Sequence, residues 1–385
     1  MHPHPPTDAQ ECVVCEVRGS AGLITLNRAR ALNALSLPMI RAISAALRVW
    51  RSDPAIRVVA MRGSMRSAAD GAGAEPFGAF CAGGDIRFFH QAALSADPQL
   101  EDFFTEEYQL NHLIHRYPKP CIAFMDGVVM GGGMGLSQGA SLRIVTERTK
   151  MAMPETAIGL FPDVGGGWFL SRCKGHLGEY LALTGVQIGA AQALAAGLAD
   201  VGRDSGDLNA LWDGLAHWPL VSGPAGSAAE HWLAGKALQR NDHRDWPSPA
   251  VDRHFGLASV AGIIASLEAT AGSDAWANDT AKALRKQSPL MLCVSLEQIR
   301  RARKLGLEDA LRMERDLVRH CFHTVHLGRY GAAGETVEGI RALAVDKDRS
   351  PKWNPQRIED VTPHMVDPFF RSPWPASGHP LRDLA

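Results

Sequence analysis

The chain has 385 residues, of which 46% are hydrophobic and 21% charged, the composition of an ordinary globular protein. This length exceeds what one compact core usually holds, so we expect one main domain with a substantial extension. The formal net charge is −1 and like charges form no blocks, which argues against partners such as nucleic acid or an anionic membrane surface. The seven cysteines are scattered, no apolar run is long enough to span a membrane, and we expect a cytoplasmic protein with free thiols.

The N-terminal half is typical of an α/β core. Residues 1–10 lack the apolar stretch of a secretory signal, and we expect a loose tail there, followed by the core over residues 11–203. Cys12 and Cys15 form a CxxC pair without a second pair of ligands, so we expect neither a metal nor a redox role. The apolar patterns predict strands over 11–18, 23–26, 58–61, 121–125 and 142–146, and helices over 37–50 and about 132–140.

The remaining segments differ in character from this core. Residues 64–78 are small, polar and glycine-rich, which predicts a surface loop. Strand signals end at residue 203, and residues 204–349 show helical spacing throughout. The proline-rich segment 350–385 is expected to be irregular. Helices are expected over 206–217, 226–239, 257–269, 273–286, 288–304, 307–320 and 333–345.

Three segments combine glycines or acids in a pattern that indicates chemistry: Phe80–Asp85, Met130–Gly135 and Met153–Gly167. Glycines between a strand and a helix let the backbone approach a ligand and leave N–H groups unpaired, which stabilise negative charge. Such turns also occur for tight packing alone. A dinucleotide site fits poorly because Leu136 stands where the third glycine of GxGxxG is required, and no GK[ST] sequence supports a phosphate-binding loop.

These segments, together with Leu26–Leu35, resemble the enoyl-CoA hydratase/isomerase (crotonase) superfamily over roughly residues 11 to 355. The run Met153–Gly167, the triplet Glu106-Glu107-Tyr108 and the segment Asp346–Trp353 resemble the branch of 3-hydroxyisobutyryl-CoA hydrolases. The resemblance implies a crotonase-like α/β fold, a spiral of ββα units, here with a helical C-terminal region. It also implies an acyl-CoA substrate, no cofactor beyond the coenzyme A of that substrate, no metal, and a possible homo-oligomer such as a trimer.

The same resemblance implies a set of site residues. It places the backbone N–H groups of Gly84 and Gly132 around the thioester oxygen and makes Glu155 and Asp163 the catalytic acids. Glu155 is either the base that activates water or the nucleophile that attacks the thioester. The substrate-binding residues that it implies are Glu107, Arg28, Arg30, Ala82 and Asp85.

Two positions then favour hydrolysis over hydration. Hydratases of this superfamily carry a glutamate directly after the second glycine turn, where this chain has Gly135, and a glycine where it has Asp163. We therefore expect cleavage of a short 3-hydroxyacyl-CoA, with 3-hydroxyisobutyryl-CoA from valine breakdown as the leading substrate. An enoyl-CoA hydratase or isomerase and a non-catalytic acyl-CoA-binding scaffold are the alternatives.

Each acid also has a purely structural interpretation. Glu155 follows a proline and is placed like an acid in the first turn of a helix. Asp163 is placed like a cap for the turn over residues 164–167. Glu107, in an EE pair, is typical of a solvated helix face.

Overall fold

The structure is a computed structural model that describes residues 12–65, 77–218, 232, 246 and 249–385. The expected N-terminal tail, most of the expected loop over 64–78 and most of the helix expected over 226–239 lie outside these residues. The chain forms two compact units, each built from separate stretches of sequence. The first, here the sheet unit, comprises Met1–Gly84, Gln109–Met151 and Gln187–Arg244. The second, the helical unit, comprises Asp85–Tyr108, Ala152–Val186 and Asp245–Ala385.

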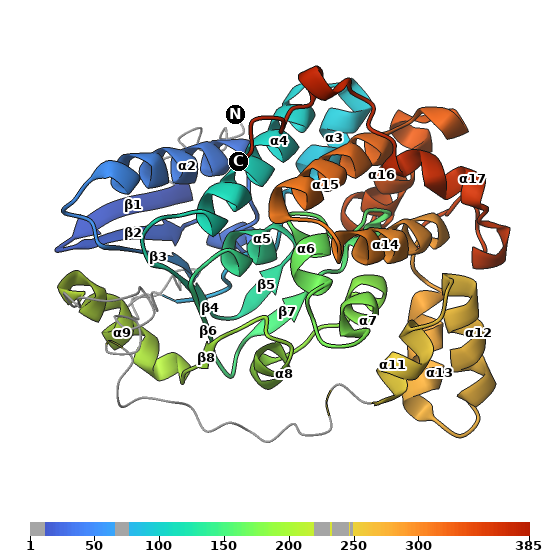
Figure 1. The fold of residues 1–385 in the computed structure, drawn as a ribbon, viewed down its shortest axis with the longest axis horizontal. Coiled ribbons are helices and arrows are strands. Elements are labelled where there is room, and N and C mark those ends of the chain that lie inside the picture. The colour runs from blue at the N-terminus through green and yellow to red at the C-terminus, as the bar shows by residue number, and fades with distance from the viewer. Residues whose placement is uncertain (1–11, 66–76, 219–231, 233–245, 247–248) are drawn as a thin grey trace. The chain divides into compact units, whose positions relative to one another are not determined.

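The sheet unit is organised around a main sheet of six strands in the described part of the chain, in the order β1-β2-β3-β4-β6-β8 (Figure 1). The first two strands form an antiparallel hairpin and the rest pair in parallel. Strands β2 and β4 are buried along their whole length, as expected for strands inside a parallel sheet. The strands are β1 Val13–Arg18, β2 Ala21–Leu26, β3 Val58–Gly63, β4 Cys121–Met125, β6 Leu142–Val145 and β8 Val201–Gly202. The strands predicted from sequence are thereby confirmed.

Helices cover both faces of this sheet. Alternate residues such as Phe124 pack against α9, where Trp212 lies in the same apolar cluster. On the opposite face the ring of Trp50 in α2 lies so close that a Cβ on Gly22 would be 2.5 Å from it. The predicted helix 37–50 is therefore confirmed, with its apolar stripe packed on the sheet. The other elements of this unit are α2 Leu37–Ser52, β5 Val128–Met130, α5 Gly132–Gln138, β7 Lys150–Ala152, α8 Ala190–Ala195 and α9 Leu208–Gly214, with β7 ending one residue beyond the unit.

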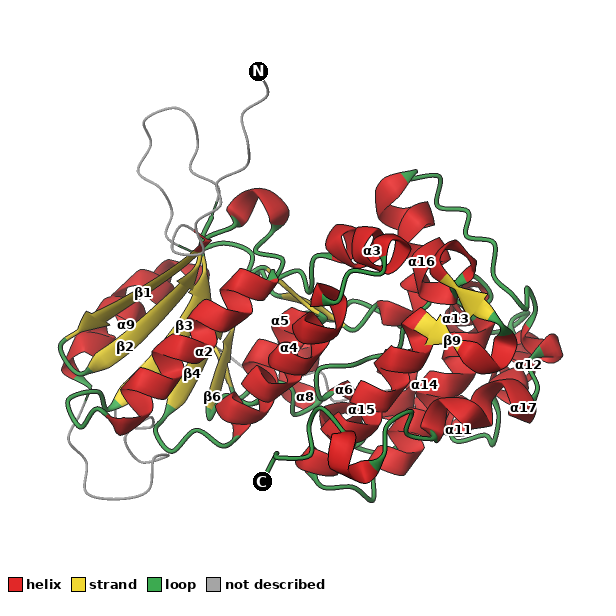
Figure 2. Ribbon diagram, turned by 90° about the horizontal axis from the view of Figure 1, so that it is seen from above, coloured by secondary structure: helices red, strands yellow, loops and turns green. Residues whose placement is uncertain are grey.

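The helical unit contains helices α3, α6, α7 and α11 to α17, and also the first part of α4 (Figure 2). Most helices predicted beyond residue 250 are confirmed. The prediction that strands end at residue 203 is wrong for β9 and β10, because two-residue strands are too short to show an alternating pattern. None of the helices in the described part of the chain is long and apolar enough to cross a membrane. The elements are α3 Ile86–Ser95, α4 Gln99–His115, α6 Gly166–Leu170, α7 Leu177–Thr184, α11 Pro249–Phe255, α12 Val260–Thr270, α13 Ala275–Leu284, α14 Pro289–Ala302, α15 Leu307–Phe322, β9 His323–Thr324, β10 Arg329–Tyr330, α16 Glu335–Ile340 and α17 Pro363–Val366.

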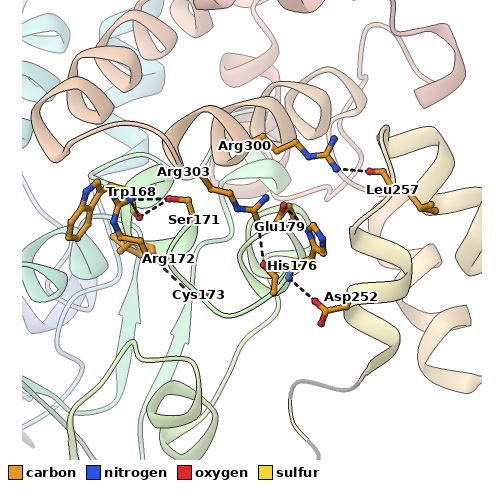
Figure 3. A network of polar contacts seen from close by, with 12 residues as sticks. Trp168, Ser171, Arg172, Cys173, His176, Glu179, Asp252, Leu257, Arg300 and Arg303 are labelled. Carbon is orange, nitrogen blue, oxygen red and sulfur yellow. Dashed lines mark hydrogen bonds and ion pairs between the residues drawn. The ribbon is translucent and has the colours of Figure 1, made fainter.

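A polar network connects the helices of this unit (Figure 3). The fully buried carboxylate of Glu179 in α7 accepts a hydrogen bond from Arg303, just after α14, at 2.7 Å. The amide of His176 donates to Asp252 in α11 at 2.7 Å. Arg300 donates to the carbonyl oxygen of Ala258, before α12, at 2.7 Å. Helix α14 and the residue that follows it are thus joined to α7 and to the segment before α12, and α7 is joined in turn to α11.

Candidate active site

The two glycine turns lie side by side in the sheet unit. The Cys81 amide donates to Val128 O at 3.0 Å, and the Met130 amide donates to Cys81 O at 2.9 Å. A Cβ added to Gly133 would lie 2.4 Å from Cys81 O, so this approach requires a glycine. A Cβ on Gly83, whose φ is +104°, would lie 3.6 Å from the Gly132 nitrogen. The turns that precede Gly84 and Gly132 are therefore neighbours.

The amide of Gly132 begins helix α5, with Gly131 as the N-cap. An amide in the first turn of a helix has no partner within the helix. It is therefore a donor suited to a developing negative charge, as the sequence predicted for this strand-to-helix turn. Gly84, in the other turn, pairs with Leu35 as an isolated bridge.

The segment Leu26–Leu35, which carries Arg28 and Arg30, runs along the first glycine turn. The Ala82 amide donates to Leu32 O at 3.0 Å, and the Leu35 amide donates to Gly83 O at 2.8 Å. Arg28 donates to the carbonyl oxygen of Ala34 at 3.1 Å, and Arg30 is exposed. The structure thus brings Ala82 next to the segment that carries both arginines. Their contacts with substrate stay predictions.

Asp85 has a structural task at the start of the helical unit. Its carboxylate accepts hydrogen bonds from the amides of Arg87 and Phe88, at 3.2 and 3.3 Å, and so caps helix α3. An N-cap carboxylate satisfies amides that have no partner within the helix. A substrate contact by Asp85 stays a prediction.

Three of the predicted acids come together in the helical unit, and we call them the carboxyl cluster: Glu107, Glu155 and Asp163. Their exposed fractions are only 2%, 6% and 5%. Each influences the ionisation of another, since the charges of Asp163 and Glu155 both raise the pKa of Glu107. The interpretation of Glu107 as a solvated helix face is therefore wrong: α4 turns this side chain inward.

Asp163 is held by Tyr108, the residue next to Glu107 in α4. The Tyr108 hydroxyl donates a hydrogen bond of 2.8 Å to Asp163 Oδ2. The N-cap of the following helix α6 is Gly165. The carboxyl group of Asp163 thus has a tyrosine as partner, which does not support its interpretation as a turn cap.

Glu155 begins the short 3-10 helix Glu155–Ile158 and is buried there. Its placement at a helix start, one of the two interpretations of the sequence, is therefore correct. Among the described residues, however, Oε2 of Glu155 and Oε1 of Glu107 have no hydrogen-bond partner. Buried polar atoms are usually satisfied, so such atoms mark a place where a polar group of a substrate would fit.

Burial is the largest cause of the raised pKa values in the cluster, because loss of solvent disfavours the charged form of a carboxyl group. It raises the pKa of Asp163 to about 7, although hydrogen bonds from Tyr108 and from its own amide favour the anion. Burial, followed by the charge of Asp163, raises the pKa of Glu155 well above its ordinary value. At neutral pH the cluster therefore retains protons, and Asp163 is its most readily ionised member. Groups in such a state can donate and accept protons near physiological pH.

The described residues were also compared with the pattern of a metal site. Within the residues that the structure describes, no group of three or more His, Cys, Asp and Glu side chains is arranged to hold a metal ion.

Comparison with known proteins places the chain in a family. The model of the enoyl-CoA hydratase/isomerase family matches residues 21–370. The chain belongs to this family. This member is 36% identical over 368 residues to the mitochondrial 3-hydroxyisobutyryl-CoA hydrolase of Gallus gallus, covering 95% of this chain and 90% of that protein. It is 37% identical over 378 residues to the mitochondrial 3-hydroxyisobutyryl-CoA hydrolase of Homo sapiens, with the same coverage.

Solved structures confirm the fold of this family member. A carnitinyl-CoA dehydratase from Mycobacterium thermoresistibile superposes with a TM-score of 0.79 at 34% identity, covering 97% of this chain and 99% of that one. An enoyl-CoA hydratase from Rhodobacter sphaeroides superposes with a TM-score of 0.76 at 36% identity, covering 93% and 97%. The predicted crotonase-like α/β fold and the resemblance to 3-hydroxyisobutyryl-CoA hydrolases are thereby confirmed.

Two residues next to the carboxyl cluster, Tyr108 and Glu314, were not predicted from the sequence. Tyr108 was noted as part of the triplet with Glu107, but no role followed from that position. Glu314, in α15, is fully buried and accepts hydrogen bonds from the amides of Gly165 and Gly167. Its sequence surroundings, Arg312 to Asp316, are highly charged and typical of a solvated helix, so no local signal could have shown its burial.

Proposed function

We propose that this protein hydrolyses the thioester of a short 3-hydroxyacyl-CoA to the 3-hydroxy acid and free coenzyme A. The observation that carries the proposal is the buried pair Glu155 and Asp163, with Asp163 held by Tyr108. Helix α5 has Gly135 where hydratases carry the first of their two acids, so we assign proton transfer to Glu155 and Asp163 on the later loop. The similarity to 3-hydroxyisobutyryl-CoA hydrolases over about nine-tenths of their length supports the same reaction.

The proposed reaction assigns a task to each group. Glu155 takes a proton from water as the water oxygen bonds to the thioester carbon, and the carbonyl electron pair moves onto oxygen. The amides of Gly84 and Gly132 donate hydrogen bonds to that oxygen, each contributing about 2.7–4 kcal/mol of barrier lowering. The electron pair on this oxygen then moves back to form the carbonyl bond again, and the carbon–sulfur bond breaks. Asp163 in its protonated form supplies the proton for the departing thiolate.

A second route uses Glu155 as nucleophile. A Glu155 oxygen bonds to the thioester carbon, the thiolate departs with a proton from Asp163, and water then hydrolyses the resulting anhydride. Both routes need Glu155 ionised and Asp163 protonated at the moment of reaction. The charge of Asp163 raises the pKa of Glu155, so ionisation of one group disfavours ionisation of the other, and the two routes require a single negative charge on this pair.

For the acyl group we propose 3-hydroxyisobutyryl, as in valine breakdown, with 3-hydroxypropionyl close in size. The proposal includes no cofactor, and it assigns to substrate binding Glu107, Arg28, Arg30, Ala82 and Asp85. The scattered cysteines favour the cytoplasm, whereas the vertebrate relatives have mitochondrial names. A homo-oligomer stays a prediction.

The test is a panel of short acyl-CoA thioesters. The purified protein is incubated with 3-hydroxyisobutyryl-, 3-hydroxypropionyl- and acetyl-CoA, and thiol release is followed with a colorimetric reagent. Crotonyl-CoA is added in parallel and loss of its double-bond absorbance is measured. Thiol release from the 3-hydroxyacyl-CoAs supports hydrolysis. Hydration of crotonyl-CoA without thiol release would establish the hydratase alternative, and binding without either reaction would establish the scaffold alternative.

A further inference from the structure

Glu314 is a buried acid for which the proposed reaction has no direct use. Its carboxylate accepts the Gly165 amide at 2.7 Å through Oε2 and the Gly167 amide at 2.8 Å through Oε1. Both amides lie in the turn that follows Asp163 and begins helix α6. One carboxylate thus holds two neighbouring points of the loop that carries a catalytic acid.

Gln298 in α14 extends this contact to the other side of Asp163. Its Nε2 atom donates to Pro162 O at 2.7 Å and to Glu314 Oε1 at 3.2 Å. The packing is tight, since a Cβ on Gly167 would lie 2.9 Å from Gln298 Nε2 and 3.0 Å from Glu314 Oε1. Asp163 is therefore flanked on both sides by residues that α14 and α15 hold in place.

The loop needs such external partners because its backbone conformation is unfavourable by itself. Val164 has a φ of +54° and Gly165 a φ of +88°, the left-handed region that a β-branched residue such as valine rarely adopts. Helix α6 has only five residues, and its first amides lack partners within the helix. Without the Glu314 carboxylate, these buried amides would be unpaired and the turn would relax toward other conformations.

We propose that Glu314 is a positioning residue: through the amides of Gly165 and Gly167 it holds Asp163 where the hydrolysis requires it. This inference rests on the proposed function. It differs from a catalytic role, because Glu314 acts through the loop and not on the reacting atoms.

A double-mutant cycle tests the inference. Glu314→Gln keeps the length of the side chain but presents one N–H donor group to an amide and so loses one of the two contacts. We expect kcat for 3-hydroxyisobutyryl-CoA to fall by about 10- to 100-fold, with KM little changed, because small displacements of reacting groups have effects of this size. In the Asp163→Asn background the same change should lower kcat by no more than about twofold, because Asp163 is the residue through which Glu314 acts.

The matched control is Asp309→Asn, which alters an exposed acid on the same helix that pairs with Arg312, and it should leave kcat unchanged. A wild-type protein that releases no thiol from any of the thioesters contradicts the proposed function itself. An active wild type with unaltered kcat in Glu314→Gln overturns only the positioning role. Equal losses in the wild-type and Asp163→Asn backgrounds would do the same, because they would indicate a general structural effect.

A second variant decides the matter if Glu314→Gln does not fold, as judged by circular dichroism. Gln298→Met leaves Glu314 in place but removes two hydrogen bonds: the one to Glu314 Oε1, which helps to hold that carboxyl group against the two amides, and the one to Pro162 O. We expect a smaller decrease in kcat, again with KM little changed and again absent in the Asp163→Asn background. An unaltered kcat in this variant would overturn the inference.

Discussion

The hydroxyl of Tyr108 donates a hydrogen bond of 2.8 Å to the carboxylate of Asp163, between two buried side chains 55 positions apart in the sequence. The other two acids of the carboxyl cluster, Glu107 and Glu155, each have one carboxyl oxygen without a hydrogen-bond partner among the described residues. A hydrogen bond to the anion lowers the pKa of the acceptor. Without bound substrate, Asp163 is therefore the member of the carboxyl cluster that ionises first. Its charge in turn raises the pKa of Glu155 and of Glu107.

Replacing Tyr108 by Phe removes this hydrogen bond and little else. The proposed reaction needs one ionised carboxylate in the cluster, so kcat should rise with pH through about 7, the pKa of Asp163. In Tyr108→Phe that pKa should increase, and the acidic limb of the profile should move to higher pH by about one to two units, the effect of a hydrogen bond to a charged group. The measurement is kcat for thiol release between pH 5 and 9. The matched control is Tyr117→Phe, which removes a hydroxyl that donates to Leu47 O, and an identical limb in both variants would contradict the prediction.

Glu155→Gln preserves the shape of the side chain and removes its ability to accept a proton or attack carbon. We expect thiol release to fall by about 10²–10⁴-fold, the usual contribution of a positioned base, and Glu155→Ala to nearly abolish turnover. Retained activity in either variant would remove Glu155 from the mechanism.

A single turnover of the wild type in water enriched in ¹⁸O separates the two roles of Glu155. Attack by Glu155 leaves the label in its own carboxyl group after the anhydride is hydrolysed at that side, and mass spectrometry of the peptide detects it. Label found only in the released 3-hydroxy acid over repeated turnovers excludes an anhydride that is hydrolysed at the Glu155 carbon.

Gly132→Pro tests the proposed oxyanion donor. Proline has no N–H group but is accommodated at the first position of a helix, which is the place of Gly132 in α5. Loss of one such donor should lower kcat by about 10²–10³-fold with a small effect on KM. Thermal unfolding of the variant, compared with wild type, separates this loss from misfolding. A folded variant with normal kcat would exclude the Gly132 amide from the reaction.

The buried acids also predict how stability depends on pH. In the unfolded chain Glu and Asp lose their protons near pH 4, whereas burial raises the pKa of Asp163 to about 7 and that of Glu314 to about 8. Between these values the folded protein binds more protons, so the free energy of unfolding should fall as pH rises, by at most about 1.4 kcal/mol per pH unit for each group. Urea denaturation at about pH 5.5 and about pH 8 measures this slope. It should be shallower in Glu314→Gln, and an equal slope would contradict the raised pKa of Glu314.

The fold could be predicted well where local pattern and tertiary structure agree. The strand Cys121–Met125 is a short apolar run between turn signals, and the helix Leu37–Ser52 shows its apolar stripe directly. Strands β9 and β10 were not predicted, because a strand of two residues shows no periodicity. The burial of Glu107 was not predicted, because its helix α4 carries several charged residues and only packing decides which of them faces inward.

The sequence by itself determined the family, the two glycine turns and the identity of the acids. The glycine turns are visible in the sequence because a close backbone approach, such as that of Gly133 to Cys81, leaves no room for a side chain. Only the tertiary structure decided the state of those acids. Glu107, Glu155, Asp163 and Glu314 come from separate segments, and the ionisation of each depends on the loss of solvent and on the charges of the others. Desolvation and coulombic coupling depend on distances in space, which spacing along the chain does not contain.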